Sequence, residues 1–146
     1  MDSANGYVHV AYAIEAPEGT GVFYAHRMGP TLPFERPQVI VYGDHVTRAS
    51  VASAGDLVAV AYEDPNTGGR PYVSLALSRT AGHSWDERFV VSSDAETAER
   101  PAVALRGREV AVGWMVPNAP VARAEEPGPP TAARGGMVVV RVGRVR

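Results

Sequence analysis

Two arginines at the start of similar segments are the residues of this chain best suited to bind a ligand. Arg48 begins the segment RASVA, and Arg100 begins the segment RPAVA 52 residues later. A guanidinium group presents a planar fork of N–H donors that can hold a carboxylate at two points. The pair could therefore bind an anionic sugar or another carboxylate. The favoured alternative is that the arginines form ion pairs with Glu99, Glu96 or Asp94 and join neighbouring elements.

Adjacent carboxylates at Glu63 and Asp64 are the second candidate for chemistry. Glycoside hydrolases use two carboxyl groups about 5 to 9 Å apart for the acid and base steps. This pair ends a strand-like segment and precedes the turn-forming sequence PNTGG at 65–69. A position as solvated turn residues is therefore the favoured interpretation, with a weak ligand-binding role as the alternative.

Motifs for metal or cofactor chemistry are absent. The chain has no cysteine, and its histidines do not show metal-ligand spacing such as H-x-x-x-H. It contains no G-x-S-x-G, P-loop or G-x-G-x-x-G sequence. We therefore predict neither a metal nor a cofactor. The histidines are His9, His26, His45 and His83.

Composition limits the classes of partner. The chain has 146 residues, a net charge of −2 and 21% charged residues, so it lacks the basic field that attracts nucleic acid. Its apolar segments are shorter than the roughly 18 residues needed to cross a membrane, and no basic segment followed by an apolar run opens it. We expect no nucleic-acid or membrane partner.

The apolar residues alternate with a period of two, which is typical of β-strands. Segments such as YVHVAY at 7–12, LVAVAY at 57–62 and MVVVRV at 137–142 are rich in β-branched and aromatic residues. With 15 glycines and 12 prolines in the chain, few windows suit a helix. The sequence therefore predicts an all-β protein with almost no helix.

The strand segments recur about every 50 residues. The sequences VHVAY, VAVAY and VAVGW end in Tyr12, Tyr62 and Trp114, which are 50 and 52 residues apart. Such aromatic residues are expected in a core between repeats, although a platform that stacks on sugar is the alternative. Each copy follows a short turn, at Asn5-Gly6, Gly55-Asp56 and Gly107-Arg108.

The repeats divide the single domain 1–146 into three units of antiparallel strands. Repeat 1 covers about 5–44, repeat 2 about 45–96 and repeat 3 about 97–146, with a flexible loop expected at 117–136. The second unit has four strands, the first lacks its innermost strand and the last lacks its outermost. This pattern predicts about three blades of a β-propeller, the first and last of them incomplete. Open blade faces need a cover, so further blades or self-association are expected.

The segment SRTAGHSW at 78–85 resembles the Asp-box S-x-D-x-G-x-x-W of sialidase-like (BNR-repeat) propellers. Ser78, Gly82 and Trp85 match the motif, and Thr80 stands where the family has aspartate. The first repeat has only Phe34 at the aromatic position. The resemblance implies a structural turn in which side chains bond to the backbone, glycine takes a positive φ and the aromatic residue packs inward.

Sialidases of this kind use three arginines, a tyrosine with a glutamate, and an aspartate. The Arg-Ile-Pro signature of that family is missing here. The expected function is therefore a non-catalytic scaffold or a module that binds glycan or protein, with the chain alone catalytically inactive. The alternative is a fragment of a sialidase-like glycoside hydrolase whose catalytic residues lie mostly elsewhere. The resemblance also favours an extracytoplasmic location.

Overall fold

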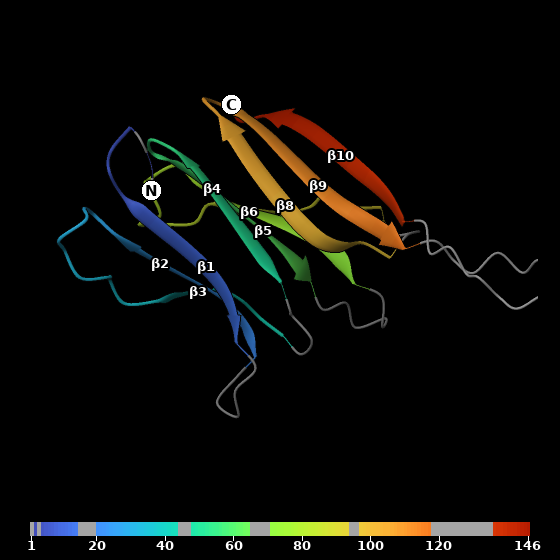
Figure 1. Cartoon of the computed structure of the whole chain (residues 1–146), viewed down its shortest axis with the longest axis horizontal. Coiled ribbons are helices and arrows are strands. Elements are labelled where there is room, and N and C mark those ends of the chain that lie inside the picture. The colour runs from blue at the N-terminus through green and yellow to red at the C-terminus, as the bar shows by residue number, and fades with distance from the viewer. Residues whose placement is uncertain are drawn as a thin grey trace, which may run out of the picture.

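The computed structural model describes residues 2, 4–14, 20–43, 48–64, 71–93, 97–117 and 136–146, and these contain ten β-strands and no helix. Figure 1 shows their arrangement. The strands are β1 (Val8–Ile14), β2 (Gly21–Arg27), β3 (Gln38–Tyr42), β4 (Ala49–Ala54), β5 (Leu57–Asp64), β6 (Tyr72–Ser78), β7 (Glu87–Val90), β8 (Glu99–Arg106), β9 (Glu109–Pro117) and β10 (Gly136–Arg144). The prediction of an all-β protein is confirmed.

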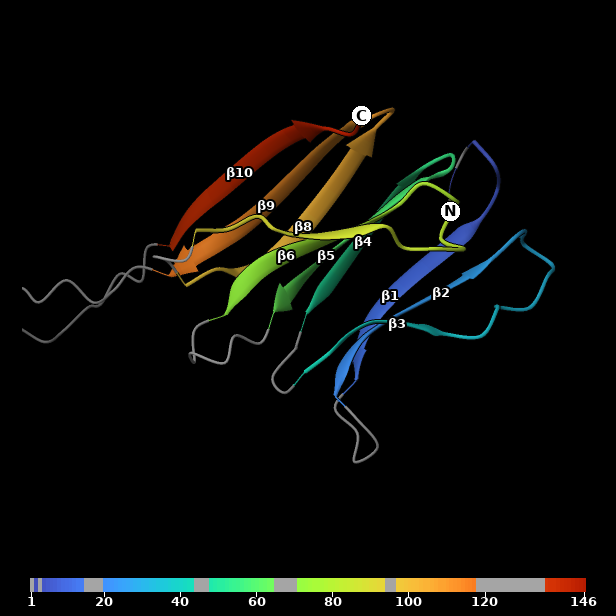
Figure 2. The same ribbon diagram turned by 180° about the vertical axis from the view of Figure 1, so that it is seen from behind.

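The strands form three antiparallel sheets, each built from consecutive segments of the chain. The first sheet has the order β1-β2-β3, the middle sheet β4-β5-β6-β7 and the last sheet β8-β9-β10. β1, β4 and β8 run side by side across the molecule, as both views show (Figures 1 and 2). None of the sheets closes on itself among the described residues.

Glycines at positive φ form the tight turns of two hairpins. Gly55 (φ +63°) lies between β4 and β5, where Ala54 pairs with Leu57, and Gly107 (φ +57°) occupies the equivalent place between β8 and β9. Two-residue hairpin turns with glycine first need this conformation, which other residues adopt only at a cost. The turns expected at these two positions are thus confirmed.

The middle sheet is covered on both sides, and β5 shows this most clearly. Successive side chains of a strand point to opposite faces. Val58, Val60 and Tyr62 pack against the first sheet, whereas Ala59 and Ala61 pack against the last. β5 is consequently buried from Leu57 to Glu63, and its continuous apolar sequence reflects two cores rather than one.

The residues before β1 attach the first sheet to a hairpin of the middle sheet. Asp2 is buried, and its carboxylate accepts hydrogen bonds from the backbone N–H of Ala4 (2.7 Å) and of Gly55 (3.0 Å). Asn5 donates from its side chain to the carbonyl of Gly55 at 3.1 Å. Burial alone would raise the pKa of Asp2, but hydrogen bonds, including that from Ser53, outweigh it and lower the pKa.

The last sheet ends in a strand that is exposed on both faces. Most of the side chains of β10 are exposed, including Val138 (67%), Val140 (59%) and Val142 (72%). Pro117 ends β9 and Gly136 begins β10, so both ends of the loop expected at 117–136 belong to strands, and residues 118–135 lie outside the described part. In that part, no helix has the length and apolar character needed to cross a membrane.

Candidate functional site

Arg48 and Arg100 lie at the same end of two neighbouring strands and line one pocket. Arg48 immediately precedes β4, and Arg100 is the second residue of β8. The pocket has a volume of about 360 Å³. Its lining consists of Tyr12, Ala13, Arg48, Ala49, Arg100 and Pro101. The structure therefore brings together the two arginines that the sequence indicated.

A backbone irregularity places Arg100 at the pocket. The pairing of β8 with β9 shifts register between Glu99 and Ala102, which makes Arg100 and Pro101 part of a β-bulge. Arg100 has a φ of +55°, a conformation that costs a residue other than glycine on the order of 1 kcal/mol. The residue is exposed, so the strain is not offset by burial of its side chain. Bulges and strained residues of this kind are concentrated at functional sites.

A buried glutamate lies beneath the two arginines. The side chain of Glu63 is 8% exposed, and its Oε1 accepts a hydrogen bond from the backbone N–H of Arg100 at 2.7 Å. The same oxygen lies 3.7 Å from Nε of Arg48. This contact differs from the expected pairing with Glu99, while Asp94 and Glu96 lie outside the described residues. Glu63 thus connects the middle sheet to the last one.

Glu63 and Asp64 end β5, so their expected position at the end of a strand is confirmed. The interpretation of the pair as solvated turn residues is wrong, because Glu63 is buried and Asp64 is half-buried. Asp64 accepts a hydrogen bond from the hydroxyl of Ser74 at 2.8 Å, and burial raises its pKa although that bond opposes the shift. As neighbours on a strand, the two carboxylates point to opposite faces, so they do not flank a common space as glycosidase carboxylates do.

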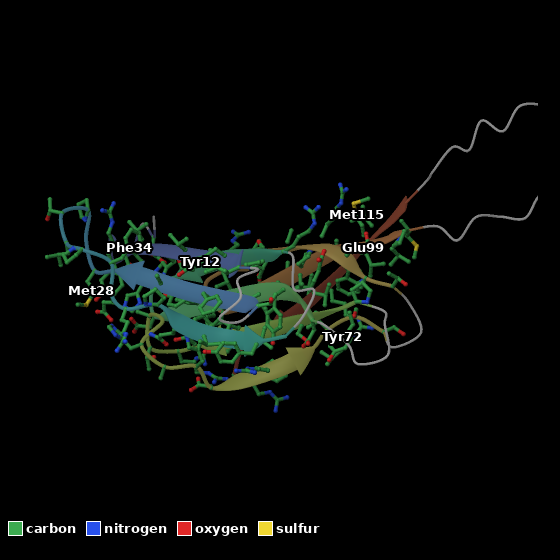
Figure 3. The ribbon with its side chains drawn as sticks, turned by 90° about the horizontal axis from the view of Figure 1, so that it is seen from below. Tyr12, Met28, Phe34, Tyr72, Glu99 and Met115 are labelled. Atoms are coloured by element: carbon green, nitrogen blue, oxygen red, sulfur yellow. The ribbon has the colours of Figure 1, made fainter. Side chains whose placement is uncertain are left out.

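The recurring aromatic residues divide into two kinds. Tyr62 and Trp114 are each 1% exposed and belong to the cores on either side of the middle sheet. Tyr12 is only half-buried, stacks on Phe23 with ring centroids 5.9 Å apart and lines the arginine pocket. Figure 3 shows Tyr12 on the first sheet. Only Tyr12 is placed to contact a ligand at the pocket.

The segment 78–85 forms the turn between β6 and β7. The hydroxyl of Ser78 accepts hydrogen bonds from the N–H of Thr80 (3.2 Å) and of Gly82 (3.0 Å). The hydroxyl of Thr80 accepts one from the N–H of Ser84 at 2.8 Å, so a threonine bonds the turn backbone where the motif has aspartate. Gly82 has a φ of +90°. These contacts give the turn a structural role.

Trp85 closes the turn against the neighbouring sheet. Its ring meets that of Tyr24 edge to face, with centroids 4.8 Å apart. Tyr24 is fully buried, and its hydroxyl lies 2.7 Å from Nδ1 of His9. The side-chain amide of Gln38 donates to the carbonyl of Gly82 at 3.0 Å. The turn therefore belongs to the interface between the first and middle sheets.

No protein-family model matches the chain, and comparisons with curated proteins and with solved structures find no match either. The chemistry of the pocket therefore carries the functional argument. Two exposed guanidinium groups and one aromatic ring favour binding of an anion, and the buried carboxylate of Glu63 beside them partly offsets the positive charge.

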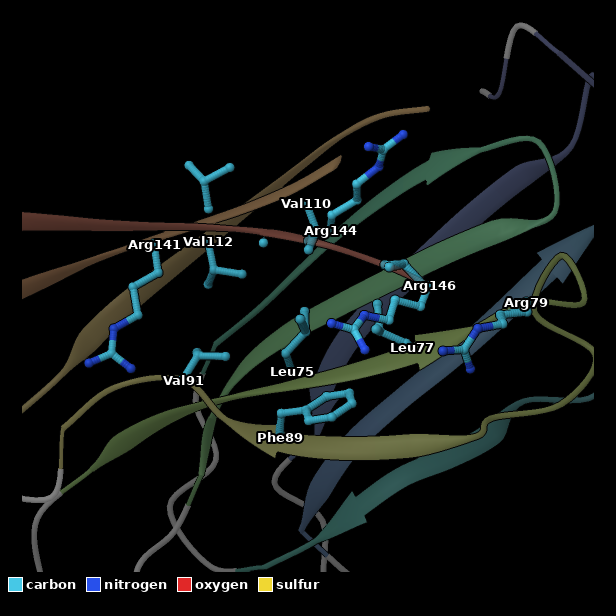
Figure 4. A pocket seen from close by; sticks show the side chains of 13 residues that line it. Leu75, Leu77, Arg79, Phe89, Val91, Val110, Val112, Arg141, Arg144 and Arg146 are labelled. Carbon is cyan, nitrogen blue, oxygen red and sulfur yellow. The ribbon is translucent and has the colours of Figure 1, made fainter. Parts of the chain in front are cut away.

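A second concave surface was not indicated by the sequence. It is an open groove of about 470 Å³ between the middle and last sheets (Figure 4). Leu75, Leu77 and Val112 contribute to its apolar lining, and arginines lie around it. These arginines are Arg79, Arg141, Arg144 and Arg146. The arginine-rich sequence RVGRVR at 141–146 is the only sequence signal that could have indicated this groove.

Proposed function

We propose that the three sheets are consecutive blades of a β-propeller of the sialidase-like type. Three observations support this. The sheets have three, four and three strands in the order of the chain, each covers the face of the next, and β1, β4 and β8 lie side by side. The turn at 78–85 adds hydrogen bonds of the kind that the Asp-box motif makes. On this proposal β1 takes the second position of its blade, and β4 and β8 are innermost strands.

We further propose that the chain is a non-catalytic module that binds an anionic ligand, an acidic sugar or similar carboxylate, at the arginine pocket. The observation that carries this proposal is the convergence of Arg48 and Arg100 from two different sheets on one pocket. With Glu63 ionised, the three groups retain a net charge of +1. A guanidinium group grips the two oxygens of a carboxylate, and the ring of Tyr12 offers a face to the apolar side of a sugar.

Glu63 orients the pocket rather than reacting in it. Its Oε1 contacts the side chain of Arg48 and the backbone of Arg100 together. The bulge that results directs Arg100 out of the strand ladder. The side chain of Arg48, which is held in this way, loses less conformational entropy when a ligand binds.

The test is binding of N-acetylneuraminic acid, measured by calorimetry or by NMR titration at low salt. Its methyl ester, which lacks the carboxylate charge, is the matched ligand. Arg48→Ala and Arg100→Gly should each weaken binding of the acid at least tenfold, whereas Arg106→Ala, at the opposite end of β8, should leave it unchanged. Equal binding of acid and ester, or equal loss in all three variants, would contradict the proposal.

The alternative function is that of a fragment of a sialidase-like glycoside hydrolase. The arginine pocket is the observation that favours it, because that family binds the substrate carboxylate through arginines. Release of fluorophore from a fluorogenic sialoside by the purified chain, lost in Arg100→Ala, would support this alternative. Binding without such release would support the non-catalytic proposal.

The exposed strand β10 suggests how the chain associates. Val138, Val140 and Val142 form an apolar surface that a further blade would cover, either from a second copy or from a longer chain. Light scattering over a concentration series measures self-association directly. A stable dimer that Val140→Lys abolishes would show that a second copy covers β10, and a monomer at every concentration would contradict self-association through this strand.

A further inference from the structure

Three residues that are distant in the sequence converge at the interface between the first and middle sheets. His26 lies in β2, Glu35 in the segment between β2 and β3, and His83 in the turn between β6 and β7. One ligand-type atom from each of them lies within 4.8 Å of the other two. Spacing along the chain predicts no metal here, because the three residues come from different elements.

His26 is the unusual member of this cluster. It is fully buried, yet neither ring nitrogen has a hydrogen-bond partner among the residues that the structure describes. A buried polar atom without a partner is destabilising, so such a group needs an explanation. Nε2 of His26 lies 3.6 Å from Oε2 of Glu35, too far for a hydrogen bond. A cation between Nε2 of His26 and Oε2 of Glu35 would give each of these two atoms a partner.

We propose that His26, Glu35 and His83 form a zinc site that links the first sheet to the middle sheet. Two imidazoles and one carboxylate are a ligand set that Zn²⁺ accepts in proteins, with a fourth position left for water or another ligand. In such a tetrahedral site, neighbouring ligand atoms are about 3.3 Å apart, as metal–ligand bonds of about 2.0–2.2 Å require. The distances here are 3.6 Å from His26 Nε2 to Glu35 Oε2 and 4.0 Å from His83 Nδ1 to the same oxygen.

The distances between the ligand atoms must shorten for zinc to bind, and the side chains that are free to move can provide this change. Glu35 and His83 have side chains that are 39% and 45% exposed, which also gives an ion a route from solvent. Their backbones are held in place: the N–H of Glu35 donates to the carbonyl of His26 at 2.8 Å, and that of His83 to the carbonyl of Thr80 at 3.0 Å. We therefore expect rotation of these two side chains to bring the ligand atoms together.

Aromatic rings enclose the buried side of the cluster. The ring of His26 lies edge to face with that of His83 at a centroid distance of 4.7 Å and is stacked near Tyr24 at 5.6 Å and Tyr7 at 6.2 Å. This packing fixes the orientation of the imidazole before an ion arrives.

The test is titration of the whole chain with Zn²⁺ in a buffer that does not chelate metals. We expect one ion per chain, and the visible absorption of tetrahedral Co²⁺ when cobalt replaces zinc. Glu35→Gln and His83→Ala alter exposed side chains, so folding should survive, and each should weaken zinc binding at least tenfold. Glu109→Gln, an exposed carboxylate on β9, is the matched control and should have no effect.

A second readout detects the link between the sheets. Zinc should raise the midpoint of thermal unfolding of the unmodified chain and of Glu109→Gln, and this rise should disappear in Glu35→Gln and His83→Ala. The proposal is overturned if no ion binds at 100-fold excess of zinc over protein. It is also overturned if zinc binds the two ligand variants as tightly as the unmodified chain.

Discussion

Replacement of Gly82 by alanine should destabilise the interface between the first and middle sheets. Gly82 lies in the turn between β6 and β7 with a φ of +90°, and a Cβ atom at this position would overlap the hydroxyl of Tyr24. The ring carbons of that tyrosine would be 2.5 Å (Cζ) and 2.7 Å (Cε1) away. Contacts this short do not persist, so Tyr24 or the turn must move.

The cost has three parts. The positive φ costs alanine about 1–2 kcal/mol. Displacing the fully buried Tyr24 costs about 1–3 kcal/mol, as overpacking of a core usually does. Loss of the contact between its hydroxyl and Nδ1 of His9 adds about 1 kcal/mol. We therefore expect Gly82→Ala to lower the free energy of unfolding by roughly 3–6 kcal/mol, a large share of the 5–15 kcal/mol typical of a domain.

Gly107→Ala is the matched control for this prediction. Gly107 has a φ of +57°, but apart from its two chain neighbours none of the described residues has an atom within 4 Å of the place that a Cβ would take, so only the conformational cost of about 1–2 kcal/mol applies. Urea unfolding followed by the fluorescence of Trp85 and Trp114 reports on both sheet interfaces. In a Tyr24→Leu background, the extra cost of Gly82→Ala should shrink, because the ring that causes the clash is gone.

The result that would refute this reasoning is equal destabilisation by Gly82→Ala and Gly107→Ala. In that case the turn would move away from Tyr24 without loss of stability. The packing of Trp85 on Tyr24 would then not fix the position of the turn. An unchanged effect in the Tyr24→Leu background would lead to the same conclusion.

Three further predictions concern other parts of the structure. Burial, with the charge of Asp64 adding to it, raises the pKa of Tyr62 to about 12 from 10.0, so the associated stability is complete below pH 10 and is lost as the pH rises towards 12. The stability lost over this range is about 2–3 kcal/mol. Tyr62→Phe should flatten this part of the pH dependence of the free energy of unfolding, measured in urea. Asp2→Ala removes the hydrogen bonds that a buried carboxylate accepts from Ala4, Gly55 and Ser53 and should cost about 2–3 kcal/mol; a loss below about 0.5 kcal/mol would mean that the segment before β1 does not hold Gly55. Glu63→Ala should cost a similar amount and weaken carboxylate binding through Arg48 and Arg100, and unchanged binding would show that Glu63 does not position the arginines.

The strands could be predicted from the sequence because each depends on a local pattern. Period-two alternation indicates a strand, and the strands recur with the same turns, so the division into three, four and three strands follows from the repeat alone. Gly55 and Gly107 marked hairpins because their positions require a positive φ. Equivalent places in successive repeats also explain why Arg48 and Arg100 were expected to lie together.

What the sequence did not reveal depends on contacts between repeats. Glu63 is buried because its partner is the backbone of Arg100, 37 residues away, in a bulge that no local pattern indicates. His26 and His83 come from different repeats, so no short spacing joins them. The apolar segment of β5 predicted a strand, but only the packing of a sheet on each face shows why its small alanines and its larger valines alternate.

The construction of every sheet from consecutive strands has a consequence for synthesis of the chain. Hairpin contacts form early because their loops are short, so the first sheet can assemble while later residues are still being added. The middle sheet cannot complete its packing at that stage, because one face of β5 and β6 packs against residues of the last sheet. A nascent chain that ends before residue 97 would therefore present Leu57, Leu75 and Leu77 to solvent or to a chaperone. These side chains become buried once the chain has been extended through Trp114, which packs in the same cluster.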